Sequence, residues 1–228
     1  AAPVGAAGDA ASDELEGVSF KTAMRSRTIY VLAIGSSCLW FTFQGINSQI
    51  QIFFELEAGL SPVDATRLYS SIFGFSVAGK FLFGAISDRY PKRYVMRASS
   101  ALLLIGCLSI FTIDAGIFGL TSNVYQLALF TALFGLGYGG SFTMIQLVAV
   151  ESFGRRALGK LLGIIIGIDS FGGMLGTILP GQMKTATGSY LFPFSVVSVV
   201  AFVALINVLL IKPVPAATGD PGGSPATP

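Results

Sequence analysis

Six apolar stretches divide this sequence, and each is long enough to cross a lipid bilayer as a helix. They cover residues 28–54, 68–87, 94–113, 123–150, 161–183 and 190–211. A transmembrane helix needs about 20 predominantly apolar residues to span the hydrocarbon core. Only 11% of the residues are charged, against about 25% in an ordinary soluble domain. The sequence therefore predicts an all-α membrane protein with six transmembrane helices.

The cationic residues are distributed unevenly between the connections. Eleven of the 14 Lys and Arg residues lie at one set of alternate span ends, whereas the opposite set holds only Arg67 and Lys184. Short loops rich in Lys and Arg stay in the cytoplasm. We therefore expect a multi-pass protein of the cell membrane with both termini in the cytoplasm. The eleven residues are Lys21, Arg25, Arg27, Arg89, Lys92, Arg93, Arg97, Arg155, Arg156, Lys160 and Lys212.

The two ends of the sequence differ from its apolar centre. Residues 1–27 begin with small, polar and acidic residues and contain no signal-peptide core. We interpret them as a cytoplasmic linker, largely disordered, that continues a longer chain. Residues 212–228 are rich in Pro, Gly and Ala, a composition that buries too little apolar surface to fold. This predicts a transmembrane domain at 28–211 followed by a disordered cytoplasmic tail.

Catalytic chemistry has little material in this sequence. There is no His, so neither a Ser-His or Cys-His nucleophile nor a His-ligated metal is available. Cys38 and Cys107 lie inside apolar runs and indicate small buried side chains. Asp169 alone does not supply the two carboxylates of an aspartyl mechanism. We expect no enzymatic activity, no metal, no cofactor and no nucleic-acid partner.

Polar residues are concentrated in four of the six stretches. The first holds Gln44 and Asn47, the second Lys80, the fourth Tyr138 and Ser141, and the fifth Asp169. The third and sixth stretches carry few polar groups, as expected of helices at the periphery of a bundle. The first, second, fourth and fifth helices are therefore expected to line a wet cavity, in which the polar side chains contact either a polar substrate or a neighbouring helix.

Glycines recur every four residues in the fifth stretch. One series is Gly159, Gly163 and Gly167, and a second is Gly172 and Gly176. Small residues at this spacing let another helix backbone approach closely. We expect this face to pack against a neighbouring helix, with sliding or rocking of the helices as a compatible alternative.

Lys80 and Asp169 are the two ionisable side chains deep within the apolar stretches. Lys80 precedes Asp88 by eight residues and Asp169 follows Lys160 by nine, so both lie about 12–14 Å from the same end. A charge at this depth costs about 2.5–3.5 kcal/mol and is usually functional or paired. Lys80 either binds the carboxylate of an organic anion, reaches toward the cytoplasm, or pairs with Asp169. Asp169 is either a proton carrier or the counter-ion of Lys80.

The segment GAISDRYPKR resembles the signature loop of the major facilitator superfamily, a class of secondary transporters. Pro91 stands where the family usually has Gly. The segment from ESFGRR to GSYLFPF is also similar to the eleventh helix and the start of the twelfth in such transporters. In the family the loop is a cytoplasmic gating motif whose acidic residue holds helix ends together. The matching residues are Gly84, Asp88, Arg89, Lys92 and Arg93.

The resemblance implies one half of a twelve-helix fold. Residues 1–27 are similar to the linker before the seventh helix, so we interpret the chain as the C-terminal half, with the N-terminal six-helix half as its missing partner. Lys80 lies where oxalate, formate and monocarboxylate transporters carry a cation. This favours alternating-access transport of a small organic anion such as a monocarboxylate or dicarboxylate, by proton coupling or exchange. The alternatives are a sugar, amino-acid or drug carrier, or a receptor with this fold that carries no flux.

Overall fold

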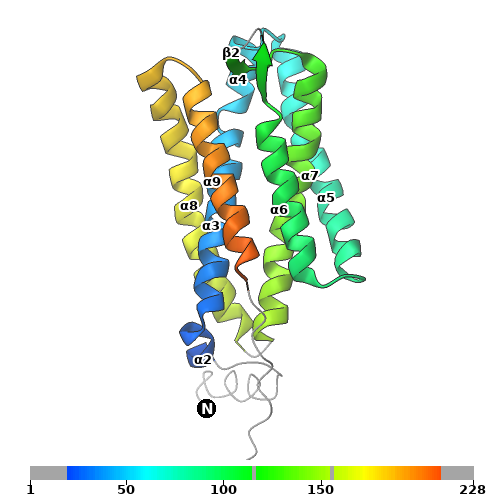
Figure 1. The fold of residues 1–228 in the computed structure, drawn as a ribbon, viewed down its shortest axis with the longest axis vertical. Coiled ribbons are helices and arrows are strands. Elements are labelled where there is room, and N and C mark those ends of the chain that lie inside the picture. The colour runs from blue at the N-terminus through cyan, green and yellow to red at the C-terminus, as the bar shows by residue number, and fades with distance from the viewer. Residues whose placement is uncertain (1–19, 115–116, 155–156, 212–228) are drawn as a thin grey trace, which may run out of the picture.

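The computed structural model describes residues 20–114, 117–154 and 157–211, in which long helices run up and down beside one another (Figure 1). Within these ranges, five helical segments are long and apolar enough to cross a membrane, the first of them being Arg27–Leu56 with a break at Ser48 and Gln49. The elements are α2 Phe20–Arg25, α3 Arg27–Asn47, α4 Ile50–Leu56, α5 Pro62–Ser87, α6 Lys92–Leu108, β1 Phe111–Asp114, β2 Ile117–Leu120, α7 Val124–Phe153, α8 Leu158–Thr187 and α9 Leu191–Leu209.

The third predicted span is shorter than expected. Helix α6 has 17 residues and ends at Leu108, so the prediction of a helix up to residue 113 was wrong. The residues that follow it are bound from another helix, since Gln126 Nε2 donates to the carbonyl oxygens of Ser109 and Phe111. The next residues are aromatic and β-branched and form the antiparallel hairpin β1–β2, in which the rings of Phe111 and Phe118 stack.

Short polar signals set the helix ends. The backbone N–H of Asp64 donates to Ser61 Oγ at 3.2 Å, and Pro62 follows in the first turn of α5. Asn123 caps α7 in the same manner by accepting from the backbone N–H of Tyr125. Gly188 ends α8 with a φ of 71°, a left-handed conformation that favours glycine. These residues mark the starts of α5 and α7 and the end of α8.

Two sets of glycines bring helices into backbone contact. Helix α5 packs against α7, where a Cβ on Gly139 would collide with the backbone of Ser76. Helix α3 packs against α8, where a Cβ on Gly176 would collide with the backbone of Phe41. The other helix pairs in contact include α6 with α7 and α9 with both α3 and α6. Close packing thus holds α8 directly on α3, which bears on the cavity between them.

The second glycine series of α8 packs as predicted, but the first does not. A Cβ added to Gly159, Gly163 or Gly167 would meet nothing within 4 Å. The prediction that this series packs on a neighbouring helix was therefore wrong among the described residues. The reason is the position of α3, which crosses α8 along Gly172 and Gly176 and leaves the glycine face of the first turns open.

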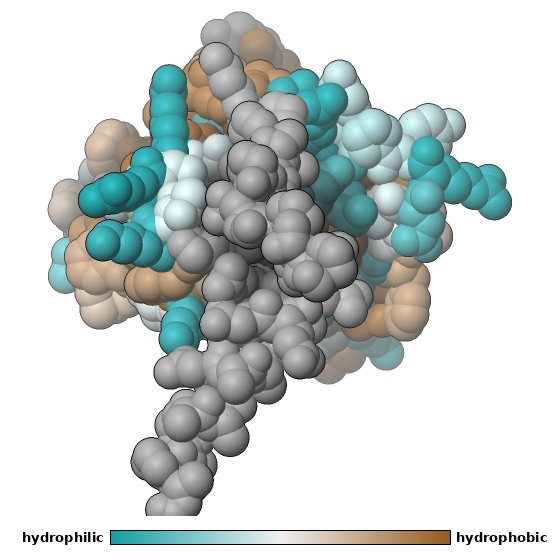
Figure 2. Space-filling model, turned by 90° about the horizontal axis from the view of Figure 1, so that it is seen from below, coloured by the Kyte–Doolittle hydropathy of each residue, from teal (hydrophilic) through white to brown (hydrophobic). Residues whose placement is uncertain are grey.

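The connections gather at two ends of the bundle. Helix α2, the α5–α6 turn, the end of α7 and the end of α9 lie toward one end, which we call the α2 end (Figure 1). Helix α4, the hairpin and the α8–α9 turn lie at the other. Figure 2 looks at the α2 end and shows hydrophilic side chains around its rim beside hydrophobic ones. The α2 end therefore corresponds to the span ends that are rich in Lys and Arg, and its orientation in the cell stays a prediction.

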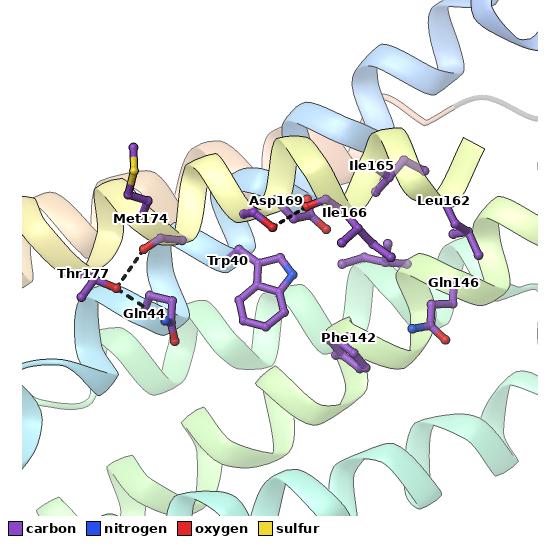
Figure 3. Close-up of a pocket in the computed structure, with 13 residues that line it drawn as sticks. Trp40, Gln44, Phe142, Gln146, Leu162, Ile165, Ile166, Asp169, Met174 and Thr177 are labelled. Carbon is purple, nitrogen blue, oxygen red and sulfur yellow. Dashed lines mark hydrogen bonds between the residues drawn. The ribbon is translucent and has the colours of Figure 1, made fainter. Parts of the chain in front are cut away.

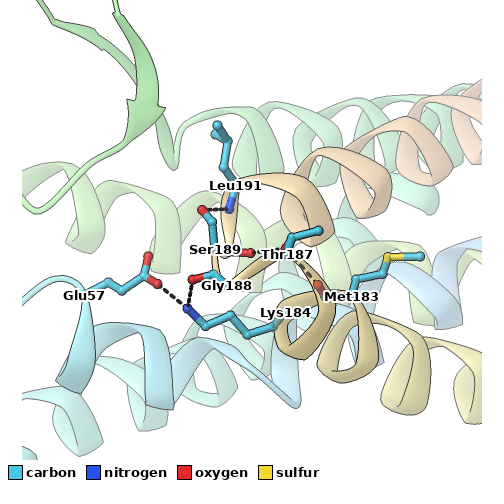
Figure 4. A network of polar contacts seen from close by, with 7 residues as sticks. All are labelled: Glu57, Met183, Lys184, Thr187, Gly188, Ser189 and Leu191. Atoms are coloured by element: carbon cyan, nitrogen blue, oxygen red, sulfur yellow. Dashed lines mark hydrogen bonds and ion pairs between the residues drawn. The ribbon is translucent and has the colours of Figure 1, made fainter.

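An ion pair links two helices at the end opposite α2. Lys184 Nζ, from the last turn of α8, lies 2.6 Å from Glu57 Oε1 and also donates to the carbonyl oxygen of Gly188 (Figure 4). The same ammonium group lies 4.3 Å from the centroid of the Tyr190 ring. Lys184 therefore joins the C-terminal end of α4 to the α8–α9 turn.

Candidate functional site

A cavity of 580 Å³ lies between α3, α7 and α8. Trp40 from α3 and Phe142 from α7 point into it beneath α8 (Figure 3). Its remaining apolar walls are Ile145, Leu162, Ile165, Ile166 and Met174, and its polar lining is Gln44, Gln146, Asp169, Ser170 and Thr177. This volume and mixed lining are typical of a site for a small molecule.

One face of α3 carries the contacts to α8. Ser36, Trp40 and Gln44 follow each other at intervals of four residues, which places them on one side of the helix. Asp169 and Thr177 have the matching eight-residue separation on α8. Ser36 bonds to Asp169, and Gln44 Nε2 lies 3.5 Å from Thr177 Oγ1. The two helices therefore run side by side along the cavity, with residues eight apart on α3 opposite residues eight apart on α8.

Asp169 is a buried acidic side chain with a polar partner on α3. Its exposed fraction is 4%. Ser36 Oγ donates to Asp169 Oδ1 at 2.5 Å, and the Trp40 side chain lines the same cavity as the carboxyl group. A buried carboxyl group needs such donors because it has lost its water. The arrangement holds Asp169 at the cavity wall in a fixed orientation.

Lys80 is exposed on α5 and does not pair with Asp169. Its Nζ lies 5.0 Å from the centroid of the Phe142 ring. Within the described residues the ion pairs are Arg67 with Asp64 and Lys184 with Glu57, so Lys80 and Asp169 form none here. Phe142 also lines the cavity. The cation is therefore adjacent to the cavity wall, and the two charges have separate surroundings.

Tyr138 and Ser141 lie beside the cavity and not on it. The Tyr138 ring stacks on Phe43 with centroids 3.6 Å apart. Ser141 is buried, and its Oγ lies 3.3 Å from Ser99 Oγ on α6. Both border a small void of 10 Å³ with Trp40, too small for a substrate. In this arrangement Ser141 has a packing contact, and Tyr138 supports the aromatic wall.

Asn47 and Gln44 occupy different environments although they are one turn apart. Gln44 lines the cavity. Asn47 is the last residue of α3, and its Oδ1 is buried without a hydrogen-bond partner among the described residues. Asn47 therefore adjoins the break between α3 and α4, farther from Asp169 along the helix.

The signature loop forms a tight turn between α5 and α6. Asp88 caps the C-terminus of α5, and Pro91 directly precedes the first turn of α6. Asp88 and Arg89 are exposed, whereas Lys92 and Arg93 are half-buried. Among the residues described here, Asp88 has no ion pair, so this half alone contains no partner for the proposed gating contact. A Cβ on Gly84 would meet nothing within 4 Å.

Most residues of the site were not predicted from the sequence, among them Ser36, Trp40, Phe142 and Gln146. Trp40 is the single Trp of the chain and stands four residues before Gln44, so helical spacing from a predicted polar residue identifies it. The same step back from Trp40 reaches Ser36. Gln146 carries the same signal as Gln44, an amide within an apolar stretch, whereas Phe142 shows no signal because an aromatic residue is common in such stretches.

The part of the chain that the structure describes offers no cluster of side chains for metal binding. No group of three or more His, Cys, Asp or Glu residues gathers there to hold a metal ion. Cys38 and Cys107 both have free thiols. The cavity beside Asp169 is thus the strongest candidate for a functional site.

The sequence matches the family model of the Major Facilitator Superfamily over residues 19–228. The chain belongs to this superfamily. It is a multi-pass membrane protein, and its helices form about half of a major-facilitator fold.

Two curated relatives and one solved structure are similar to this superfamily member. The sialic acid transporter NanX of Escherichia coli (strain K12) is 25% identical over 161 residues, which are 68% of this chain and 38% of that protein. The cis,cis-muconate transport protein of Acinetobacter baylyi is 23% identical, over 82% of this chain and 44% of that protein. The chain thus spans less than half the length of these relatives.

The solved structure is a mutant of the peptide transporter POT in complex with alafosfalin. It superposes with a TM-score of 0.70 at 15% identity, covering 89% of this chain and 41% of that one. This likeness establishes the fold of the bundle.

Proposed function

We propose that this chain is the C-terminal half of a secondary active transporter that moves a small organic anion across the cell membrane by alternating access. The cavity between α3, α7 and α8 carries the proposal, because it joins a 580 Å³ space to a buried carboxyl group halfway along the helices. In secondary transporters the two halves move around a binding site near the bilayer midplane.

Lys80 is the residue proposed to bind the anionic group. It is the one cation deep within the apolar stretches of the sequence, and its Nζ rests on the Phe142 ring without a carboxylate partner among the described residues. An unpaired ammonium group at this depth is costly unless an anion joins it. Sialic acid and cis,cis-muconate, named for two relatives, are both carboxylate compounds.

Hydrogen-bonding side chains complete the proposed substrate site. Gln44 borders the cavity directly. Asn47 lies on α3 and Tyr138 on α7, two of the helices that form the cavity. Ser141 contributes to the proposed site indirectly. Its contact with Ser99 on α6 supports the neighbouring residue Phe142.

Asp169 is proposed to couple transport to a proton, or to permit exchange. Its carboxyl group faces the cavity and accepts a hydrogen bond from Ser36, so a residue of α8 is tied to α3. A change in its protonation alters a contact between two helices that both border the substrate. This link gives protonation a physical route to the cavity.

The proposed orientation puts the α2 end in the cytoplasm, following the count of cations. Asp88, Arg89, Lys92 and Arg93 then form a cytoplasmic gate with Gly84 at the helix end. The N-terminal six-helix half of the same protein is the proposed partner of Asp88, which has none among the described residues of this half.

A second candidate is a carrier of apolar compounds, such as a drug carrier. One observation favours it: no Lys or Arg stands among the residues that line the cavity, and most of its walls are apolar. The two candidates differ in what Lys80 does. An anion carrier needs the ammonium group, whereas a carrier of neutral apolar compounds does not.

Uptake by the full-length protein in proteoliposomes tests the proposal. A panel of radiolabelled monocarboxylates and dicarboxylates is compared with neutral apolar compounds of similar volume. We expect saturable uptake of at least one carboxylate, abolished by Lys80→Gln and kept by the control Lys160→Gln, which removes an exposed charge near the α2 end. Uptake of neutral compounds that Lys80→Gln leaves intact would favour the second candidate.

A further inference from the structure

The first turns of α6 carry two arginines on one tyrosine ring. The guanidinium carbon of Arg93 lies 5.2 Å from the centroid of the Tyr94 ring, and that of Arg97 lies 5.3 Å from it. Tyr94 itself is 53% exposed. Both guanidinium groups are therefore gathered around one exposed aromatic side chain.

This cluster has more positive charge than its surroundings balance. Neither arginine has a carboxylate partner in the described ranges. Arg93 and Arg97 are four residues apart on one helix, a spacing at which like charges repel. Arg97 Nη2 donates to the carbonyl oxygen of Leu209 at 3.1 Å, while its Nε is buried without a partner among the described residues. An anion that approaches both groups would relieve this imbalance.

The position of the cluster indicates where that anion comes from. Arg97 contacts the last turn of α9, and Arg93 lies in the first turn of α6, so the cluster lies where α9 ends and α6 begins near the α2 end. Both helices expose large apolar side chains along their length, among them Ile105 on α6 and Phe202 on α9. An exposed Tyr at the end of such a helix is typical of the membrane–water interface.

We infer that Arg93 and Arg97 bind the phosphate group of an anionic phospholipid at the bilayer surface, between the ends of α6 and α9. Guanidinium groups bind phosphate oxygens through paired hydrogen bonds, and Arg is preferred to Lys for this geometry. Tyr94 holds the two groups together on its ring. Basic sites between helices at the cytoplasmic surface bind lipid headgroups in the same way.

Retention of lipid by the purified full-length protein tests the inference. Native mass spectrometry in detergent measures binding of phosphatidylglycerol, phosphatidylcholine and inorganic phosphate. We expect phosphatidylglycerol to bind most tightly, and removal of each charge in Arg93→Gln and Arg97→Gln to weaken it about fivefold. Lys160→Gln is the matched control and leaves binding unchanged.

Arg97→Gln also removes the bond to Leu209, so it can impair folding. Arg93→Gln breaks no hydrogen bond among the described residues and keeps the test decisive, and Arg97→Lys retains the charge without the paired donors. Equal binding of phosphatidylglycerol and phosphatidylcholine overturns the inference, and so does wild-type binding by Arg93→Gln. Displacement of the lipid by millimolar inorganic phosphate identifies free phosphate as the ligand and overturns the lipid assignment.

Discussion

Substitution of Gly176 by Ala tests the contact that holds α8 on α3 beside the cavity. A Cβ at this position would lie 2.9 Å from the Phe41 Cα and closer still to its carbonyl oxygen. Overpacking costs about 1–3 kcal/mol, and the upper end applies here because the neighbouring group is backbone and not a flexible side chain. Replacing Gly by Ala within a helix stabilises the folded state by about 0.5–1 kcal/mol. The net loss of unfolding free energy is then about 2 kcal/mol.

Thermal unfolding of the purified protein in detergent measures this loss. A change of about 2 kcal/mol lowers the Tm by about 4–8 °C in a chain of this size. Gly173→Ala is the control on the same helix, since its added Cβ would meet only Gln44 Cγ at 3.4 Å, an ordinary contact. We expect it to leave the Tm unchanged or slightly raised. Equal Tm values for the two variants would refute the close approach of α8 to α3.

Three further predictions concern orientation, gating and packing. Cys introduced at Asp64 in a Cys-free background should react with an impermeant thiol reagent in sealed cells, whereas reaction of Cys at Lys92 would show the opposite orientation. Asp88→Asn should lower transport at least tenfold at normal abundance, because it removes charge and little volume; a matching loss of abundance would indicate a folding role. Ser141→Ala should change the KM for substrate less than twofold, because its hydroxyl bonds to Ser99; a larger rise would place it in contact with substrate.

The presence of the helices was predictable from the length of the apolar stretches, but the positions of the helix ends were predictable only in part. Ser61 with Pro62 and Asn123 mark the starts of α5 and α7 as their chemistry predicts. The end of α6 was missed, because residues 109–113 are mostly apolar and continue the hydropathy of the span. The turn into the hairpin is bound from another helix, since Gln126 on α7 donates to the carbonyl oxygens of Ser109 and Phe111. No local pattern reports such a contact.

The candidate site was predictable where polarity marks a span and not where aromatic residues form it. Asp169 and Gln44 were identified because a charge or an amide in an apolar run is costly. Phe142 was missed, since an aromatic residue in a membrane helix carries no such cost. The glycines of α8 illustrate the same limit, because equal spacing predicted equal packing for Gly163 and Gly176, and the crossing of α3 covers only one of them.

The most direct test of the proposed mechanism separates the roles of Lys80 and Asp169. Proton-driven uptake and substrate exchange are measured in proteoliposomes for Lys80→Gln, Asp169→Asn and the double variant. Because exchange needs no net protonation cycle, we expect Asp169→Asn to lose uphill uptake but keep exchange, and Lys80→Gln to lose both.

The double variant decides between separate roles and a structural pair. The two side chains form no ion pair among the described residues, so removing both should not restore function. A structural pair would behave otherwise, since each single variant would strand a buried charge and fold poorly. The account predicts no recovery of transport in Lys80→Gln/Asp169→Asn. Recovery of both abundance and transport in that variant would contradict it, because a neutral pair offers no cation to the anion.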